Sequence, residues 1–216
     1  MKRYLPFVII AVVLLVVVGV AISFYRSAHR VASAGAMASG APGAEPPHTR
    51  GTRGAPVTIE EFGDFQCPPC GALYPELKKI EAEDGPQVFV IFREWPLTKI
   101  HQNALLAAHT AEAAGLQNHF WEMHDLLYQN QSAWSGAKDA RPIFISYARG
   151  IGLDADRFTR DIDGNEADAR IVADHQRGQS LGVQATPTVF INGQELSAEM
   201  TSPQGLRMAV NKILGK

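Results

Sequence analysis

Both cysteines of this 216-residue chain lie in one short motif, Cys67-Pro68-Pro69-Cys70. The β-branched and aromatic run before it predicts a strand over 57–62, followed by a turn over 63–66. Proline suits the first turn of a helix, and apolar residues then recur at helical spacing as far as residue 84. A strand that leads into Cys-x-x-Cys at the start of a helix is typical of a reactive dithiol rather than an inert core thiol.

The remaining pattern predicts an α/β fold. A nearly all-apolar run over 87–93 indicates a strand covered on both faces, so the order strand–helix–strand predicts a parallel βαβ unit. Helical patterns continue from 101 to 181, which exceeds one crossover and predicts an inserted helical subdomain at about 99–181. Three further elements are expected after it: a strand over 188–191, its hairpin partner over 194–196 across Asn192-Gly193, and a helix over 203–214.

The N-terminus carries a second strong signal. Residues 4–25 contain no charge and are nearly all apolar, longer than the core of a cleavable signal, and the site-like Ala32-Ser33-Ala34 lies well past their end. We therefore expect an uncleaved transmembrane anchor over 1–26, a flexible linker rich in small residues and proline over 27–53, and one domain over 54–216.

Charge is distributed unevenly along the chain. The net charge is +5 over residues 1–53 and −7 over residues 54–216. A mildly acidic domain argues against nucleic acid as a partner.

The two cysteines are expected to have different roles. Cys67 lies at the helix N-terminus, where free N–H groups and the helix dipole stabilise a thiolate, so we expect it to attack and to have a lowered pKa. Cys70 is one turn further on and more interior, which suits the resolving thiol. Because prolines have no N–H, Cys70 and Gly71 are the expected backbone donors, and the lowering should be smaller than with a donor in the spacer.

Together these motifs resemble the thioredoxin superfamily, and within it the DsbA-like, membrane-tethered thiol–disulfide oxidoreductases. The resemblance covers about residues 54–214. It rests on residues 61–70, on the helical insertion and on residues 186–193. It implies a thioredoxin fold, with a central mixed sheet and a helical insertion. The spacer departs from the best-known member, which has Pro-His where this chain has Pro-Pro.

The resemblance also implies further site residues. It makes Glu61 a buried acid beneath the dithiol, where a carboxyl would exchange a proton with Cys70. The alternative is a solvent-facing Glu61; since side chains alternate along a strand, Glu60 must take the opposite face together with Phe62. The family's cis-proline matches Thr186-Pro187, whose backbone would pair with an extended substrate strand. For Phe65, an apolar collar for the substrate and core packing are equally compatible with the sequence.

The implied function is disulfide exchange with exported proteins. We expect Cys67 and Cys70 to oxidise dithiols in extended or unfolded substrates, without a cofactor, and a membrane quinone-linked thiol oxidant to regenerate the disulfide. The domain would lie on the periplasmic side of a bacterial cytoplasmic membrane, held by one N-terminal span. Run backwards from an electron-donating membrane reductase, the same atoms would make a reductase or isomerase.

A metal site is the alternative of a different class. Zinc normally needs four ligands, and no second cysteine pair exists. An anchored thioredoxin-fold copper carrier typically separates its cysteines by three residues and adds a late histidine, whereas here the spacer is two residues and His175 lies in a helical stretch. His119 and His124 are expected on the polar edges of a helix, and the tryptophans are expected to pack in the core or at its rim.

Overall fold

The computed structural model describes residues 16, 18–20 and 38–216. Apart from those four N-terminal positions, the predicted anchor over 1–26 lies outside the described residues, as does the linker over 27–37. Within the described ranges, no helix combines the length and the apolar character needed to cross a bilayer.

A five-stranded mixed sheet forms the centre of the domain, in the order β1-β3-β2-β4-β5. Only β2 and β3 pair in parallel, joined by helix α2, which confirms the predicted βαβ unit. The other neighbours are antiparallel. The strands are β1 (His48–Gly51), β2 (Val57–Gly63), β3 (Val88–Glu94), β4 (Thr188–Ile191) and β5 (Gln194–Glu195).

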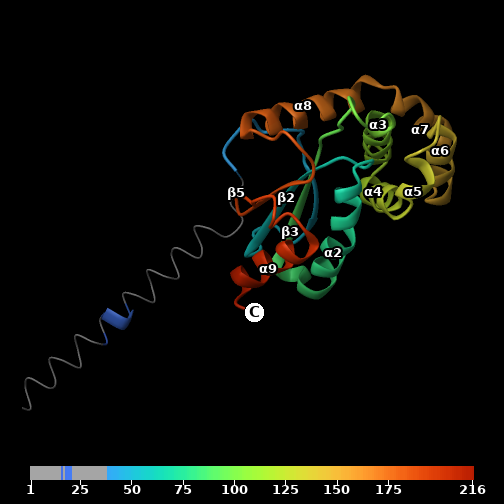
Figure 1. Ribbon diagram of the computed structural model, residues 1–216. Coiled ribbons are helices and arrows are strands. Elements are labelled where there is room, and N and C mark those ends of the chain that lie inside the picture. Colours follow the sequence, from blue (N-terminus) through green and yellow to red (C-terminus); the bar gives the residue numbers. More distant parts are fainter. Residues whose placement is uncertain (1–15, 17, 21–37) are drawn as a thin grey trace, which may run out of the picture.

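Helices cover both faces of this sheet (Figure 1). On one face, Ile59 of β2 packs with Leu73 and Leu77 of α2 and with Val210 of α9. On the other face, Phe62 packs with Phe190 and Trp95, and α8 runs across this side. The helices are α2 (Pro68–Asp84), α3 (Ala104–Gly115), α4 (Phe120–Gln129), α5 (Gln131–Trp134), α6 (Arg141–Gly150), α7 (Ala155–Ile162), α8 (Asn165–Leu181) and α9 (Pro203–Leu214), with a 3-10 turn at Gly85–Gln87.

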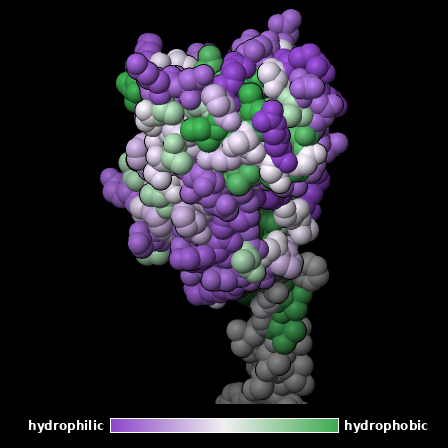
Figure 2. Space-filling model, turned by 90° about the vertical axis from the view of Figure 1, so that its right-hand side faces the viewer, coloured by the Kyte–Doolittle hydropathy of each residue, from purple (hydrophilic) through white to green (hydrophobic). Residues whose placement is uncertain are grey.

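The predicted helical insertion is confirmed as helices α3 to α8. Its buried residues, among them Met123, Trp134, Phe144 and Phe158, join the dithiol in one apolar core. The outward face over these helices is mostly hydrophilic, with apolar side chains singly or in small groups (Figure 2). The insertion therefore packs directly against the active-site end of the domain.

The expectation of a flexible linker is wrong for residues 38–53. Residues 48–51 form strand β1, antiparallel to β3, which sequence reasoning missed. Residues 38–44 are held by two buried arginines: Arg93 donates to the carbonyls of Ala44 and Pro42, and Arg177 to those of Ala41 and Ala38. Small residues and prolines suit this segment because its hydrogen bonds are made by the backbone. The folded domain thus begins by residue 38.

Candidate active site

The dithiol lies where β2 passes into α2, as predicted. Cys67 is the N-cap of α2 and Pro68 occupies its first turn. Two hydrogen bonds to Asp64 stabilise the preceding turn. The Cys67 N–H donates to the Asp64 carbonyl, and the Gln66 N–H donates to the Asp64 carboxylate. From the insertion, the Gln131 amide donates to the carbonyls of Phe65 and Cys67, at 2.7 and 2.9 Å. Helix α5 therefore holds the active-site turn in place.

Cys67 is primed as a thiolate. A hydrogen bond from the Cys70 thiol is the largest of the effects that lower the pKa of Cys67 to about 6, while burial acts to raise it. The Cys70 backbone N–H also contributes, as expected. The Gly71 N–H does not fill the expected role, because it donates to the Cys67 carbonyl at 3.1 Å in the first turn of the helix.

Cys70 is the protected partner. It is fully buried, and burial raises the pKa of its thiol well above the ordinary value. Cys67 is 4% exposed and its neighbours Pro68 and Pro69 are exposed, so the rim of the site opens on the Cys67 side. Both cysteines are thus buried, and Cys67 is the one that lies nearer to the exposed rim.

Glu61 lies inside the domain, so the solvent-facing alternative is wrong. It is 3% exposed, and burial is the largest cause that raises its pKa to about 8, while the charge of Arg50 lowers it. A charged Glu61 raises the pKa of Cys70, and a charged Cys67 raises the pKa of Glu61. At neutral pH this carboxyl is mostly protonated, which suits a proton donor to a departing thiolate.

Glu60 takes the opposite face, as strand alternation predicts. It is also buried, but it is paired with Arg93 and Arg177. Phe62 shares that face, packing against Trp95 and Phe190.

The Thr186-Pro187 bond is cis, as the resemblance implies, and both residues are partly exposed beside the dithiol. The Thr186 carbonyl lies 3.3 Å from Cys67 Sγ. The bend and the sulfur therefore form a single small surface.

Phe65 lies in the core, which favours the packing alternative over a substrate collar. Its side chain is 1% exposed and stacks on Phe92 at 5.2 Å between ring centroids, with Tyr128 at 5.0 Å. A ring enclosed in this way has no face for a substrate.

His124 corrects another expectation. It is fully buried among aromatic rings rather than on a polar edge, and burial lowers its pKa to about 4. Its Nδ1 lies 2.9 Å from the Asp125 carboxylate. The predicted packing roles of Trp95 and Trp134 agree with their burial.

Sequence reasoning missed several polar residues near the dithiol. Asp64 lies 2.7 Å from His101 and accepts the Leu97 N–H, which fixes the loop after β3. Glu94 and Tyr128 are buried on the same side of the sheet as Glu61. The acidic residue at the end of an apolar strand was the available signal for Glu94; the partner of Asp64 depended on tertiary folding.

The part of the chain that the structure describes contains no group of three or more His, Cys, Asp or Glu side chains placed to hold a metal ion. His175, the residue considered for a copper carrier, stacks flat on Trp95 at 4.2 Å between ring centroids.

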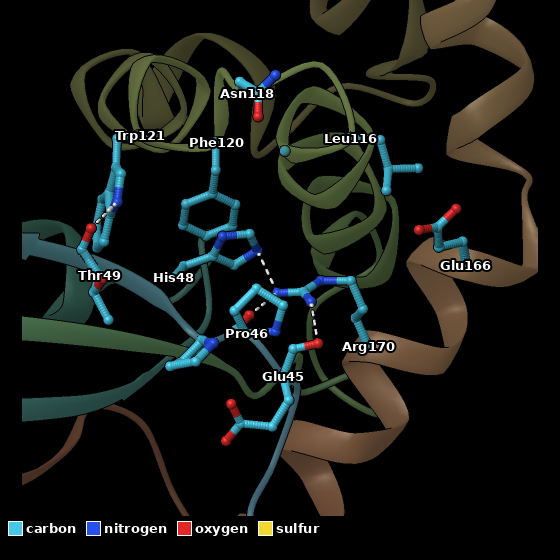
Figure 3. Close-up of a pocket in the computed structure, with 12 residues that line it drawn as sticks. Glu45, Pro46, His48, Thr49, Leu116, Asn118, Phe120, Trp121, Glu166 and Arg170 are labelled. Atoms are coloured by element: carbon cyan, nitrogen blue, oxygen red, sulfur yellow. Dashed lines mark hydrogen bonds between the residues drawn. The ribbon is translucent and has the colours of Figure 1, made fainter.

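An open pocket of about 460 Å³ lies away from the sulfurs, between β1, α3, α4 and α8 (Figure 3). The His48 ring lies flat on Phe120, and the Arg170 guanidinium approaches it from α8. Behind the pocket, His48 Nε2 and Arg170 Nε lie 2.9 and 2.6 Å from the same oxygen of Glu112, which is fully buried.

Comparisons with known proteins agree with this geometry. A family model described as thioredoxin matches residues 44–212. Among solved structures, BdbD from Bacillus subtilis is 22% identical, covering 84% of this chain and all of that one, with a TM-score of 0.69. MdbA from Corynebacterium diphtheriae, described as a thiol-disulfide oxidoreductase, is 21% identical, covering 75% of this chain and 84% of that one, with a TM-score of 0.59.

A different relationship comes from curated relatives. The Na⁺/H⁺ antiporter NhaA 1 of Salinispora arenicola is 39% identical over 165 residues, which are 72% of this chain and 24% of that protein. A similar match, 40% over 148 residues, is found to NhaA 3 of Salinispora tropica. The chain thus spans about a quarter of the length of these relatives.

Proposed function

Because the chain belongs to the thioredoxin family and carries the dithiol of a DsbA-type thiol–disulfide oxidoreductase, we propose that it works as an oxidase of exported proteins. A substrate thiolate attacks Cys67 Sγ and breaks the Cys67–Cys70 bond. Cys70 leaves as a thiolate and takes a proton from Glu61. The second substrate thiol, as its thiolate, then attacks the substrate sulfur of the mixed disulfide, and Cys67 leaves as a thiolate.

The observation that carries the oxidase direction is the lowered pKa of Cys67. A thiolate that the reduced protein stabilises makes the disulfide more oxidising, because the reduced form is the product of substrate oxidation. A pKa of about 6 places most of this sulfur in the thiolate form at neutral pH.

Broad specificity for extended polypeptide follows from the Thr186-Pro187 rim. Backbone hydrogen bonds to Thr186 would hold a substrate strand next to Cys67 Sγ without selecting its side chains. The substrates proposed are therefore unfolded or extended chains that contain cysteines.

The proposed location is the periplasmic side of a bacterial cytoplasmic membrane. The long uncharged run over residues 4–25 supports an N-terminal anchor. A membrane quinone-linked thiol oxidant is the proposed partner that restores the disulfide, since an anchored domain and a membrane enzyme share the same surface.

The equilibrium reduction potential of the full-length chain in detergent, measured in glutathione buffers, tests the direction. The oxidase proposal expects a value toward about −120 mV, the range of strong dithiol oxidants, rather than about −270 mV, that of thioredoxin-type reductants. A value near the lower figure would reverse the proposal in favour of a reductase. The paired prolines, which supply no N–H to the Cys67 thiolate, are the feature that favours this second candidate.

A further inference from the structure

Asp64 is a buried acid beside the dithiol that the exchange described above does not use. Its carboxylate has three donors: the Gln66 N–H at 2.7 Å, the Leu97 N–H at 2.9 Å and the His101 ring, whose Nδ1 lies at 2.7 Å. Because an ionised carboxylate can only accept hydrogen bonds, the His101 Nδ1 carries the hydrogen of this contact. The side chain of Asp64 is therefore completely held.

The backbone of Asp64 contacts both cysteines. Its carbonyl accepts the Cys67 N–H at 3.0 Å. Burial raises the pKa of Cys70 most, and a hydrogen bond from the Asp64 N–H to the Cys70 sulfur acts in the opposite sense. Since one residue supplies both contacts, a change in the orientation of Asp64 would displace the two cysteines together.

The loop over 95–103, which follows β3, is joined to the turn that precedes Cys67. Four hydrogen bonds run in the same order along both segments: from the Trp95 N–H to the Gly63 carbonyl at 2.9 Å, from the Leu97 N–H and the His101 ring to the Asp64 carboxylate, and from the Asn103 N–H to the Gln66 side chain at 2.7 Å. Of these four donors, only His101 uses its side chain. It is therefore the contact that a substitution can remove without touching the backbone.

The charge of Asp64 opposes a thiolate on Cys67. Contacts with Cys70 and Thr186 lower the pKa of Cys67 to about 6, whereas burial and the Asp64 charge raise it. The His101 ring offsets this charge, because its N–H donates to the carboxylate. Without that donor, the carboxylate would disfavour the neighbouring thiolate more strongly.

We propose that Asp64 and His101 form a positioning pair for the dithiol. His101 holds the Asp64 carboxylate and offsets its charge, while the Asp64 backbone holds the two cysteines in place for exchange. The inference rests on the dithiol function proposed above. It adds to that function the two residues that set how readily Cys67 leaves as a thiolate.

Other titratable groups near Asp64 do not replace His101. The Asp64 charge acts on Glu94 and Tyr128, but burial is the largest cause that raises the pKa of each well above the ordinary value, so both keep their protons at neutral pH. Lys99, on the same loop as His101, is exposed to water. Among the described residues, the His101 ring is thus the side chain that donates to the Asp64 carboxylate.

The experiment measures the pKa of Cys67 in the reduced full-length chain in detergent, from thiolate absorbance at 240 nm and from the rate of alkylation by iodoacetamide. His101→Phe keeps a ring and removes the donor. We expect it to raise the pKa of Cys67 by about one unit, so that alkylation is roughly tenfold slower at about pH 5 and nearly unchanged at about pH 9. His101→Gln keeps an N–H donor and should retain most of the wild-type behaviour.

Asp64→Asn supplies a test of opposite sign. It keeps the shape of the side chain and removes the charge, so the pKa of Cys67 should fall. A purely structural role would loosen the turn in both variants and shift the pKa in the same direction. His119→Gln is the matched control: this histidine, at the start of α4, also lies beside a carboxylate, 3.5 Å from Glu122, and its replacement should leave Cys67 unchanged.

Two results would overturn the inference. One is a wild-type pKa of Cys67 in His101→Phe. The other is an equal rise in His101→Phe and His101→Gln, because the donor would then not matter; this pair of variants decides even if Asp64→Asn does not fold. A wild-type chain that exchanges no disulfides would instead defeat the proposed function. The pKa of Cys67 is measured without turnover, so the two failures are distinguishable.

Discussion

Two adjacent glutamates of β2 are both buried, but on opposite faces of the sheet they have different surroundings. On the α8 face, Glu60 accepts hydrogen bonds from Arg93 and from both Nε and Nη2 of Arg177, at 2.6 to 2.9 Å. On the α2 face, Glu61 has no ion pair among the described residues, and its pKa rises to about 8. The first carboxyl is held by two arginines and supports the structure, and the second has no such partner and can change state.

The difference shows how one strand serves both stability and chemistry. Burying a charge is tolerated where partners compensate it, and the compensated cluster fixes the segment over 38–44 as well. An uncompensated acid costs stability whenever it ionises, so it is retained only where the change of state is useful.

Removing one arginine from the α8 face should have the largest effect. Arg93→Met leaves Glu60 and Asp174 with unbalanced charge in a buried site, and we expect a loss of roughly 3–5 kcal/mol in the free energy of unfolding. Urea denaturation measures it. In the double variant with Glu60→Leu, the loss should be smaller than the sum of the two single losses. A single-variant loss below about 1 kcal/mol would contradict the assignment of a stabilising charge cluster.

On the α2 face, Glu61 should make stability depend on pH in the opposite sense to an ion-paired acid. Its pKa is raised from 4.5 in the unfolded chain to about 8 in the folded one, so the folded state binds more protons between these values. Stability therefore falls as pH rises through this window, by on the order of 3 kcal/mol.

Oxidised protein suits the measurement, because neither cysteine then titrates. Urea denaturation at pH 5 and pH 8.5 should show the fall in wild type and a much smaller one in Glu61→Gln. If both proteins show the same pH dependence, Glu61 is not the group responsible.

Sequence reasoning predicted the strands and helices around the dithiol because they are encoded locally. Pro68 at a helix start and Asn192-Gly193 between strands each fix a conformation with few neighbours. The family resemblance supplied Glu61 and the cis bond at Pro187, which local patterns do not encode.

The incorrect predictions concern residues whose surroundings are not encoded locally. Residues 38–53 read as a linker because their sequence lacks apolar periodicity; their order depends on Arg93 and Arg177, which lie far along the chain. His124 was expected on a polar edge because histidine is amphipathic, whereas rings from the active-site turn, α2, β3 and its own helix α4 enclose it in the core. In both cases, contacts between distant segments decided the outcome.

Replacing Cys70 should change the free energy of ionisation of Cys67 by less than the changes in unfolding free energy expected above. The Cys70 thiol donates the hydrogen bond that most lowers the pKa of Cys67, so Cys70→Ala should raise that pKa from about 6 by about one unit, worth about 1.4 kcal/mol. Thiolate absorbance at 240 nm against pH measures the change. Cys70→Ser keeps a donor and should retain most of the lowering; an unchanged pKa in Cys70→Ala would mean that backbone groups do the work alone.

The smallest effect should come from an ion pair that is well formed but exposed. Arg141 of α6 donates two hydrogen bonds to Asp163, at 2.8 and 3.0 Å, geometry as good as that around Glu60. Its side chain is 32% exposed and that of Asp163 is 66% exposed, so water screens the charges and solvates each one when its partner is lost. Arg141→Ala should therefore change the free energy of unfolding by less than about 1 kcal/mol, against several for Arg93→Met. Urea denaturation of both variants under one condition compares them directly. Equal losses would show that burial is not what separates structural from dispensable charges in this fold, and the contrast between the two glutamates would lose its physical basis.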